Sequence, residues 1–164
     1  MIELLKVESG PELDEIRTLV LEYKQSLNFN LCFQDFDTEL RELPGEYAPP
    51  AGRLILCKFE GKPAGCIALR QLEPRICEMK RLFVRPQFRG RQLGRKLTDY
   101  LIAEARRAGY DAMRLDTIAG SMDHAIAMYR ELGFREIPPY YANPTPGAIY
   151  MELALIERSA QSPD

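Results

Sequence analysis

Histidine and cysteine are scarce in this sequence, which contains one histidine and four cysteines in 164 residues. No two cysteines have a C-x-x-C spacing, and His124 is the single imidazole. A zinc site needs four thiolate or imidazole ligands at short spacings, so we expect no metal. We interpret Cys32, Cys57, Cys66 and Cys77 as reduced core thiols. A nucleophilic cysteine is disfavoured, because only His124 could activate it.

Long apolar runs are also absent, and the first ten residues, MIELLKVESG, contain neither a basic leader nor an apolar signal region. We therefore expect a cytoplasmic protein that does not enter a membrane. An apolar share of 46% with 28% charged residues is typical of a globular chain. The length suits one domain, which we place at 1–157, followed by a loose polar tail at 158–164.

Charge is unevenly distributed along the chain. Residues 1–50 contain eleven acids and four bases, about −7, whereas residues 51–164 contain thirteen acids and eighteen bases, about +5. A basic part that binds phosphate beside an acidic part that meets a cationic amine fits this pattern, and so does a solvated acidic helix. The pI of about 5.6 and the lack of an extended basic face argue against nucleic-acid binding.

Hydrophobic periodicity predicts alternating helices and strands. Two close β runs at 53–59 and 64–72 indicate a hairpin, and a helix between the strands at 76–84 and 112–117 is long enough to make those strands parallel neighbours. The fold class is therefore mixed α/β with α+β character. The other predicted elements are a strand at 2–7, helices at 11–27, 38–43, about 93–108 and one capped by Ser121, and a last strand at 148–155.

The stretch Glu78–Leu101 changes from a strand pattern to a helix pattern. Apolar residues from Ile76 to Val84 end before Pro86, which cannot continue a sheet ladder. From Leu93 onward, leucines recur every four residues, which is the spacing of one helix face. The sequence thus predicts a strand, a short turn and a helix.

The turn between them, residues 89–94, reads RGRQLG and leads into the first helical turn. The first amides of a helix have no internal partner and point outward with the positive end of the helix dipole, which suits an anion. The turn matches neither G-x-G-x-x-G nor the P-loop, so a dinucleotide or nucleoside triphosphate is poorly supported. Seven basic residues and no acid surround it: Lys80, Arg81, Arg85, Arg89, Arg91, Arg95 and Lys96. We predict another phosphate-bearing ligand.

Residues 78–101 resemble the acyl-CoA signature of the GNAT superfamily of N-acetyltransferases, in which a strand leads into [QR]-x-x-G-x-[GA] at a helix start. Read from Arg89, Gln92 stands where the middle glycine is usual; read from Gln87, it takes the final small position. A residue other than glycine can still present its amide there if its φ is negative. The resemblance implies acetyl-CoA as acyl donor and a mostly antiparallel sheet with a central parallel strand pair, flanked by helices.

A second resemblance lies in residues 123–134, DHAIAMYRELGF, which look like the later GNAT motif A-I-x-L-Y-x-x-x-G-F. It implies that Tyr129 protonates the departing thiolate. Family members often have asparagine three residues before the alanine, and Met122 stands there instead. Without the family, a tyrosine on an apolar helix face is typical of a core residue.

Acyl transfer to an amine also needs an oxyanion donor and a route for the amine proton. We predict a backbone amide near Phe83 and Val84 for the oxyanion and Glu78 as base. Two-residue spacing along the strand places Glu78 on one face with Lys80, Leu82 and Val84. An ion pair between Glu78 and Lys80 would make Glu78 a poorer base, and water could take the proton instead. The cofactor contacts that the resemblance implies are Leu82, Phe83, Val84, Arg89, Gly90, Arg91, Gln92, Leu93, Gly94, Arg95 and Lys96.

Aromatic residues in two connecting segments are candidates for an acceptor pocket. They are Phe29 and Phe33 in the first and Tyr140 and Tyr141 in a proline-rich loop; the alternatives are core packing for the phenylalanines and anchoring of the loop for the tyrosines. We predict an acetyltransferase that uses a small-molecule amine or a protein amino group. A non-catalytic acyl-CoA-binding regulatory module is the alternative. The identity of the amine and a homodimeric state stay open.

Overall fold

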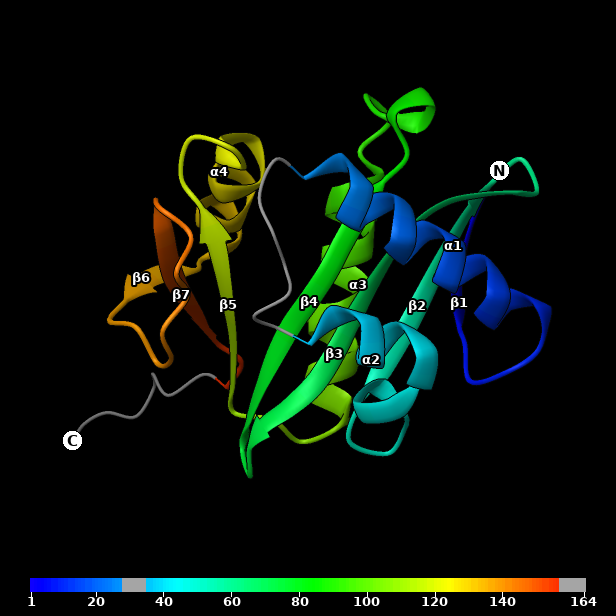
Figure 1. Ribbon diagram of the computed structural model, residues 1–164. Coiled ribbons are helices and arrows are strands. Elements are labelled where there is room, and N and C mark those ends of the chain that lie inside the picture. Colours follow the sequence, from blue (N-terminus) through cyan, green and yellow to red (C-terminus); the bar gives the residue numbers. More distant parts are fainter. Residues whose placement is uncertain (28–34, 157–164) are drawn as a thin grey trace.

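The computed structural model describes residues 1–27 and 35–156. Helices and strands alternate irregularly along these residues (Figure 1). Their bounds are β1 Ile2–Lys6, α1 Pro11–Ser26, α2 Phe36–Glu42, the short 3-10 helix η2 Gly45–Tyr47, β2 Arg53–Phe59, β3 Lys62–Glu73, β4 Ile76–Val84, the 3-10 helix η3 Pro86–Phe88, α3 Leu93–Arg107, β5 Ala112–Ile118, α4 Asp123–Leu132, β6 Arg135–Ile137 and β7 Ala148–Ala154.

The strands form one seven-stranded sheet in the order β1-β2-β3-β4-β5-β7-β6. Neighbouring strands are antiparallel except β4 and β5, which the α3 crossover makes parallel. The predicted mixed α/β fold with a central parallel pair is therefore confirmed.

Helices cover both faces of the sheet, with α1 and α2 on one side and α3 on the other (Figure 1). The α3 face has the predicted stripe: Leu93, Leu97, Leu101 and Ala105 are all buried. A second cluster, with Ile16 at its centre, packs beneath α1. Burying one leucine side chain contributes about 2 kcal/mol, so both layers hold the sheet.

Strand β4 contains a bulge at Arg81, whose φ is +63°. Pairing with β3 jumps from Ala68↔Lys80 to Cys66↔Phe83, so two β4 residues lie opposite one β3 residue. The alternation of side chains shifts there: Met79 before the bulge and Leu82 after it both pack on the α3 side. The prediction that Glu78 and Lys80 share a face with Leu82 and Val84 was therefore wrong.

Two smaller predictions also differ from the structure. The N-cap of α4 is Met122 rather than Ser121, and Asp123 accepts a hydrogen bond from the Gly120 amide at 2.8 Å. The three-residue strand β6 was not predicted, because it pairs with β7 on one side only and has no alternating pattern of its own.

Three cysteines lie in the core as free thiols. Burial raises the pKa of Cys57 to about 11 and the pKa of Cys66 and Cys77 to about 12, so all three stay protonated at neutral pH. Cys32 lies outside the described residues. Within residues 1–27 and 35–156, no group of acidic, histidine or cysteine side chains could hold a metal ion. No helix in that same part of the chain combines the length and apolar composition of a membrane span.

Candidate active site

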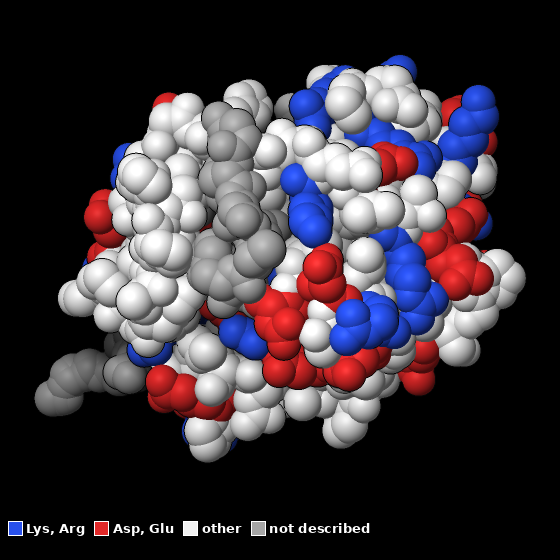
Figure 2. Space-filling view, in the orientation of Figure 1, with Lys and Arg blue, Asp and Glu red and all other residues white. Residues whose placement is uncertain are grey.

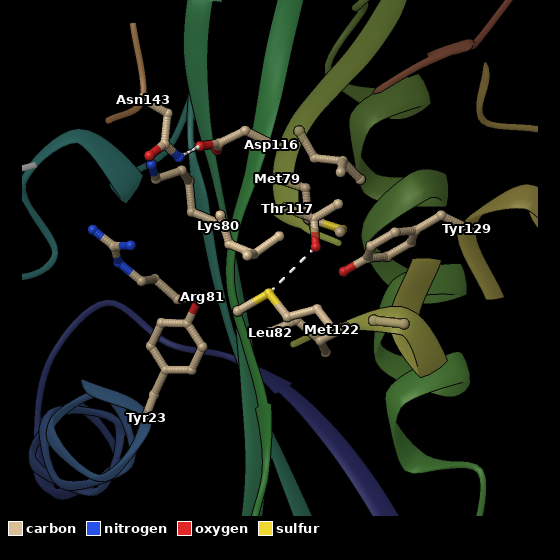
Figure 3. Close-up of a pocket in the computed structure, with 13 residues that line it drawn as sticks. Tyr23, Met79, Lys80, Arg81, Leu82, Asp116, Thr117, Met122, Tyr129 and Asn143 are labelled. Carbon is tan, nitrogen blue, oxygen red and sulfur yellow. Dashed lines mark hydrogen bonds between the residues drawn. The ribbon is translucent and has the colours of Figure 1, made fainter. Parts of the chain in front are cut away.

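Strands β4 and β5 separate after only three residue pairs. Their parallel pairing ends at Glu78↔Arg114, although the strands continue to Val84 and Ile118. A cavity lies in the opening between them (Figure 3). It is lined by Tyr23, Met79, Lys80, Arg81, Leu82, Leu115, Asp116, Thr117, Ile118, Met122, Ala125, Tyr129 and Asn143. A hollow at the carboxyl ends of parallel strands is where sheets of this kind bind ligands.

The cavity is reached from both faces of the sheet. Tyr23 and Arg81 enter it from the α1 side, and Ala125 and Tyr129 come from α4 on the opposite side (Figure 3). Beyond Glu78, the edge of β4 that faces β5 has no strand partner among the described residues. Two reactants could therefore meet in the gap from opposite faces.

Tyr129 places its hydroxyl in this gap. The side chain is buried, its ring packs on Phe134 with centroids 5.6 Å apart, and the hydroxyl points into the cavity (Figure 3). No hydrogen bond is seen between that hydroxyl and a described residue, and burial strongly raises the pKa of Tyr129. The group is thus a neutral proton donor without a protein partner at neutral pH.

The turn after β4 presents a row of free amides. The amide of Arg89 donates to Pro86 O at 3.2 Å and that of Lys96 donates to Gln92 O at 3.0 Å. Between them, the amides of residues 90–95 donate to no other residue in the described part of the chain. Gly94 lies against Val84, which brings this row to the end of β4. The row is the anion-binding helix start that the sequence predicts.

Gln92 takes a glycine-like backbone conformation, with φ +66° and ψ +22°. The sequence argument required a negative φ for a residue other than glycine, and the structure differs on this point. A left-handed residue before α3 turns the chain sharply enough that the following amides face outward. Gln92 thus keeps the backbone shape of the usual glycine at a conformational cost.

The arginine side chains of the turn contact nearby groups, although Arg89 and Arg91 are exposed. Arg89 Nε donates to Val84 O at 2.9 Å, and the Arg91 guanidinium lies 4.6 Å from the centroid of the Phe59 ring. Arg95 forms ion pairs of 3.5 Å with residues of α3 and α4. In Figure 2, Lys and Arg side chains gather near this turn, whereas charges of both signs alternate over α1 and α2. The turn is therefore a place where positive side chains gather.

Glu78 is fully buried and both of its carboxylate oxygens are bonded. Oε1 accepts from Arg70 Nε at 2.8 Å, and Oε2 accepts from the Tyr140 hydroxyl at 2.6 Å. Arg70 also bonds Glu46 on η2. Glu78 is not among the residues that line the cavity. Glu78 forms an ion pair with Arg70, which the sequence did not suggest.

Asp116 is the carboxylate that does line the cavity, and sequence reasoning missed it. Its Oδ2 accepts hydrogen bonds from the Tyr141 hydroxyl and, at 2.7 Å, from Asn143 Nδ2. No described residue donates to Oδ1. The position of Asp116 near the carboxyl end of a parallel strand was the available signal.

Tyr140 and Tyr141 lie in the loop between β6 and β7 and reach Glu78 and Asp116, so the loop forms a wall beside the gap. Their rings stack with centroids 5.6 Å apart. The other two predicted acceptor residues, Phe29 and Phe33, lie outside the described residues.

Known proteins are similar to this chain in sequence and in fold. The family described as the Acetyltransferase (GNAT) family matches residues 13–134. An N-acetyltransferase of Schizosaccharomyces pombe is 38% identical over 156 residues, which cover 94% of this chain and 95% of the yeast protein. Both helical motifs on which the resemblance rests lie within the matched region.

Solved structures show the same fold. An acetyltransferase of Streptococcus agalactiae superposes with a TM-score of 0.76 at 22% identity and covers 93% of this chain and 98% of its own. An acetyltransferase from Salmonella typhimurium, solved with its cofactor acetyl-CoA, gives a TM-score of 0.68 at 19% identity, with 97% and 96% covered. Because the family pattern spans most of the sequence and the yeast relative spans nearly all of it, this chain belongs to the acetyltransferase (GNAT) family of N-acetyltransferases.

Proposed function

We propose that the protein transfers the acetyl group of acetyl-CoA to a primary amine by direct attack in a ternary complex. One observation supports this most strongly: the bond-free amides of residues 90–95 adjoin a strand gap that contains the partnerless hydroxyl of Tyr129. An anion-binding helix start and a neutral acid in one opening are what a phosphorylated thioester carrier requires.

The residues of the turn fit the diphosphate of the carrier. The six free amides of residues 90–95, in the turn and the first helical residues of α3, supply donors, and the guanidinium groups of Arg89, Arg91 and Arg95 add positive charge nearby. The unpaired edge of β4 beyond the bulge, at Leu82 to Val84, offers a ladder for the amides of the pantetheine arm. When bound, acetyl-CoA supplies an activated acyl group on sulfur.

The end of β4 also supplies a candidate oxyanion donor. The Arg85 amide donates to Ala64 O on β3 at 2.8 Å. Because alternate amides of a strand point to the same side, the Phe83 amide also faces β3, and those of Leu82 and Val84 face the gap. We assign the oxyanion to the Val84 amide. Tyr129 then gives its proton to the leaving sulfur.

The acceptor enters from the α1 side of the gap, where Asp116, Lys80 and the loop with Tyr140 and Tyr141 lie. A small-molecule amine and a protein amino group both suit an opening of this kind. Glu78 stays a predicted base, but its bonds to Arg70 and Tyr140 must open before it can accept a proton.

Thiol release from acetyl-CoA with a panel of primary amines tests this function. The panel should contain alkylamines, amino acids, polyamines, aminoglycosides and a peptide with a free amino terminus. We expect turnover with at least one class and an upward melting shift with CoA alone. No melting shift and no calorimetric heat with CoA would exclude the assignment.

The double variant Arg91→Glu, Arg95→Glu tests the phosphate site directly. Reversing two charges beside the free amides should weaken CoA binding by at least about 100-fold, since each charge-assisted contact is worth roughly 1.5–3 kcal/mol. Retention on a nucleic-acid column should not change. A matched Arg135→Glu, Arg130→Glu variant, with both changes outside the turn, should bind CoA normally.

A further inference from the structure

We propose that Asp116 is the group that binds the acceptor's ammonium and removes its proton. The inference rests on the proposed transferase function and adds the catalytic residue on the acceptor side. It concerns the carboxylate oxygen Oδ1, because both hydrogen bonds seen for this cavity-lining residue go to Oδ2. Glu78, the carboxylate that the sequence favours, then has a positioning role.

The two carboxylates differ in what occupies their oxygens. Both oxygens of Glu78 are bonded, and its side chain is 1% exposed. Asp116 is half-buried, and its two hydrogen bonds converge on Oδ2. Oδ1 therefore has lone pairs directed at no described residue, and a carboxylate with one fixed and one free oxygen is arranged to accept a proton.

The position of Asp116 relative to Tyr129 fits a reaction across the sheet. Asp116 and Tyr129 both line the cavity, and Tyr129 comes from the α4 side (Figure 3). The Asp116 side chain turns the other way, toward Asn143 and the loop that contains Tyr141 (Figure 3). Base and acid thus lie on opposite sides of the opening. In the reaction, the amine and the leaving sulfur lie on either side of the acyl carbon, so this placement suits both proton transfers.

The other groups that face Asp116 leave this role open to it. They are Lys80, Tyr23, Tyr129, Tyr140, Tyr141 and Asn143. Burial raises the pKa of each of these tyrosines, so none competes for a proton at neutral pH. Lys80 is the cation among these groups; burial lowers its pKa, and the negative charges of Glu78 and Asp116 act in the opposite direction.

The step balances as follows. Asp116 Oδ1 accepts one proton from the ammonium, so an N–H bond breaks and an O–H bond forms, and the nitrogen lone pair attacks the acyl carbon. Tyr129 gives its proton to the sulfur as the C–S bond breaks. The second amine proton returns through solvent to the Tyr129 oxygen, and Asp116 releases its proton to water. Ammonium and thioester thus yield amide, thiol and one proton, without an oxidant or reductant.

Two amines of different basicity test the role of Asp116. Butylamine is almost wholly ammonium at neutral pH, whereas glycinamide loses its proton more readily and needs a base less. Asp116→Asn should lower kcat/KM for butylamine by about 100-fold or more and for glycinamide by clearly less. CoA affinity should stay unchanged, which separates failure of this inference from failure of the transferase assignment. The control Asp14→Asn, in an exposed carboxylate of α1, should match the wild type.

Carboxyl-carbon NMR gives a readout that does not depend on turnover. The resonance that disappears in Asp116→Asn should shift when butylammonium is added to the CoA complex. A Glu78→Gln variant identifies the second buried carboxylate, whose resonance should move less. Equal losses of kcat/KM with both amines, or a butylammonium shift at Glu78 alone, would overturn the assignment of Asp116.

Discussion

The Tyr140 hydroxyl lies 2.6 Å from Glu78 Oε2 and joins the loop after β6 to the strand at the centre of the sheet. The bond spans 62 residues of sequence, and Arg70 holds the other carboxylate oxygen. The next residue, Tyr141, bonds Asp116 on the neighbouring strand. Two adjacent tyrosines therefore bridge the two strands that diverge to form the gap, and they fix its acceptor-side wall.

Tyr140→Phe should cost more stability than Tyr141→Phe. Removing the Tyr140 hydroxyl leaves Glu78 Oε2 buried without a donor, which costs about 1–3 kcal/mol. Asp116 keeps Asn143 when Tyr141 loses its hydroxyl, so that change should cost about 1 kcal/mol or less. Urea unfolding of both variants measures the difference. Equal losses of stability in the two variants would mean that the hydrogen bond to Glu78 stabilises the fold no more than the one to Asp116.

Tyr129→Phe should retain CoA affinity and lower kcat by about 100-fold, because a general acid contributes on this scale. Burial raises the pKa of Tyr129, and a raised pKa keeps the acid form present to higher pH. The wild-type kcat should therefore show no alkaline loss from this tyrosine below about pH 10.

A pH–rate profile of kcat measures this, with Tyr100→Phe as a control that removes a tyrosine hydroxyl of α3 outside the cavity. Tyr100→Phe should turn over at the wild-type rate. Equal turnover by Tyr129→Phe would remove Tyr129 from the mechanism. An alkaline limb below pH 10 that only the wild type shows would contradict its high pKa.

Gln92→Gly and Gln92→Val should have different effects on the stability of the protein and on its affinity for CoA. A left-handed conformation costs a residue with a Cβ roughly 1–2 kcal/mol, and glycine avoids that cost while losing about 0.5–1 kcal/mol in entropy. Gln92→Gly should thus be neutral or slightly stabilising and bind CoA as before. Gln92→Val should destabilise by more than about 1 kcal/mol and weaken CoA binding, because a β-branched residue suits this φ poorly.

Thermal unfolding and calorimetry with CoA measure both effects on the same samples. Gln92→Ala serves as the intermediate variant, because alanine has a Cβ atom that is not branched. Weaker CoA binding in Gln92→Gly than in Gln92→Val would show that the glutamine side chain, rather than the backbone shape, matters for the site.

The sequence predicts the structural elements whose positions depend on local patterns of residues. The leucine stripe from Leu93 and the proline after β4 locate the strand, the turn and α3, because periodicity and proline act within a few residues. The parallel placement of β4 and β5 follows from the length of the crossover. Tyr129 in the gap follows from the family motif.

The bulge in β4 and the long-range hydrogen-bond partners of the two carboxylates could not be predicted from the sequence. Arginine at position 81 gives no sign of a left-handed residue, and one extra residue in β4 moves Leu82 and Val84 to the other face. The bonds of Glu78 to Tyr140 and of Asp116 to Tyr141 join segments that only the folded sheet brings together. The spacing of residues along the sequence therefore could not show which carboxylate has both oxygens bonded and which has one without a partner among the described residues.

Glu104 should make the stability of the protein sensitive to acid. Its side chain is 3% exposed and contacts Arg53 Nε at 2.8 Å, Lys6 Nζ at 3.5 Å and Arg107 Nη1 at 2.5 Å. Burial alone would raise the pKa of Glu104, but the hydrogen bond from Arg53 and the nearby positive charges lower it below its usual value. The folded state therefore favours the ionised carboxylate.

A depressed folded-state pKa contributes stability that is fully present above the unfolded value of about 4.3 and is lost as pH falls through the folded value. Glu104→Gln should thus lower the free energy of unfolding by about 2 kcal/mol at pH 7. Below about pH 4, the difference in unfolding free energy between this variant and the wild type should become smaller. Asp99→Asn, in an exposed pair on the same helix, should change stability by less than about 1 kcal/mol at any pH. Urea unfolding at several pH values measures these differences, and an equal cost of Glu104→Gln at pH 3 and pH 7 would place its effect in packing rather than in charge.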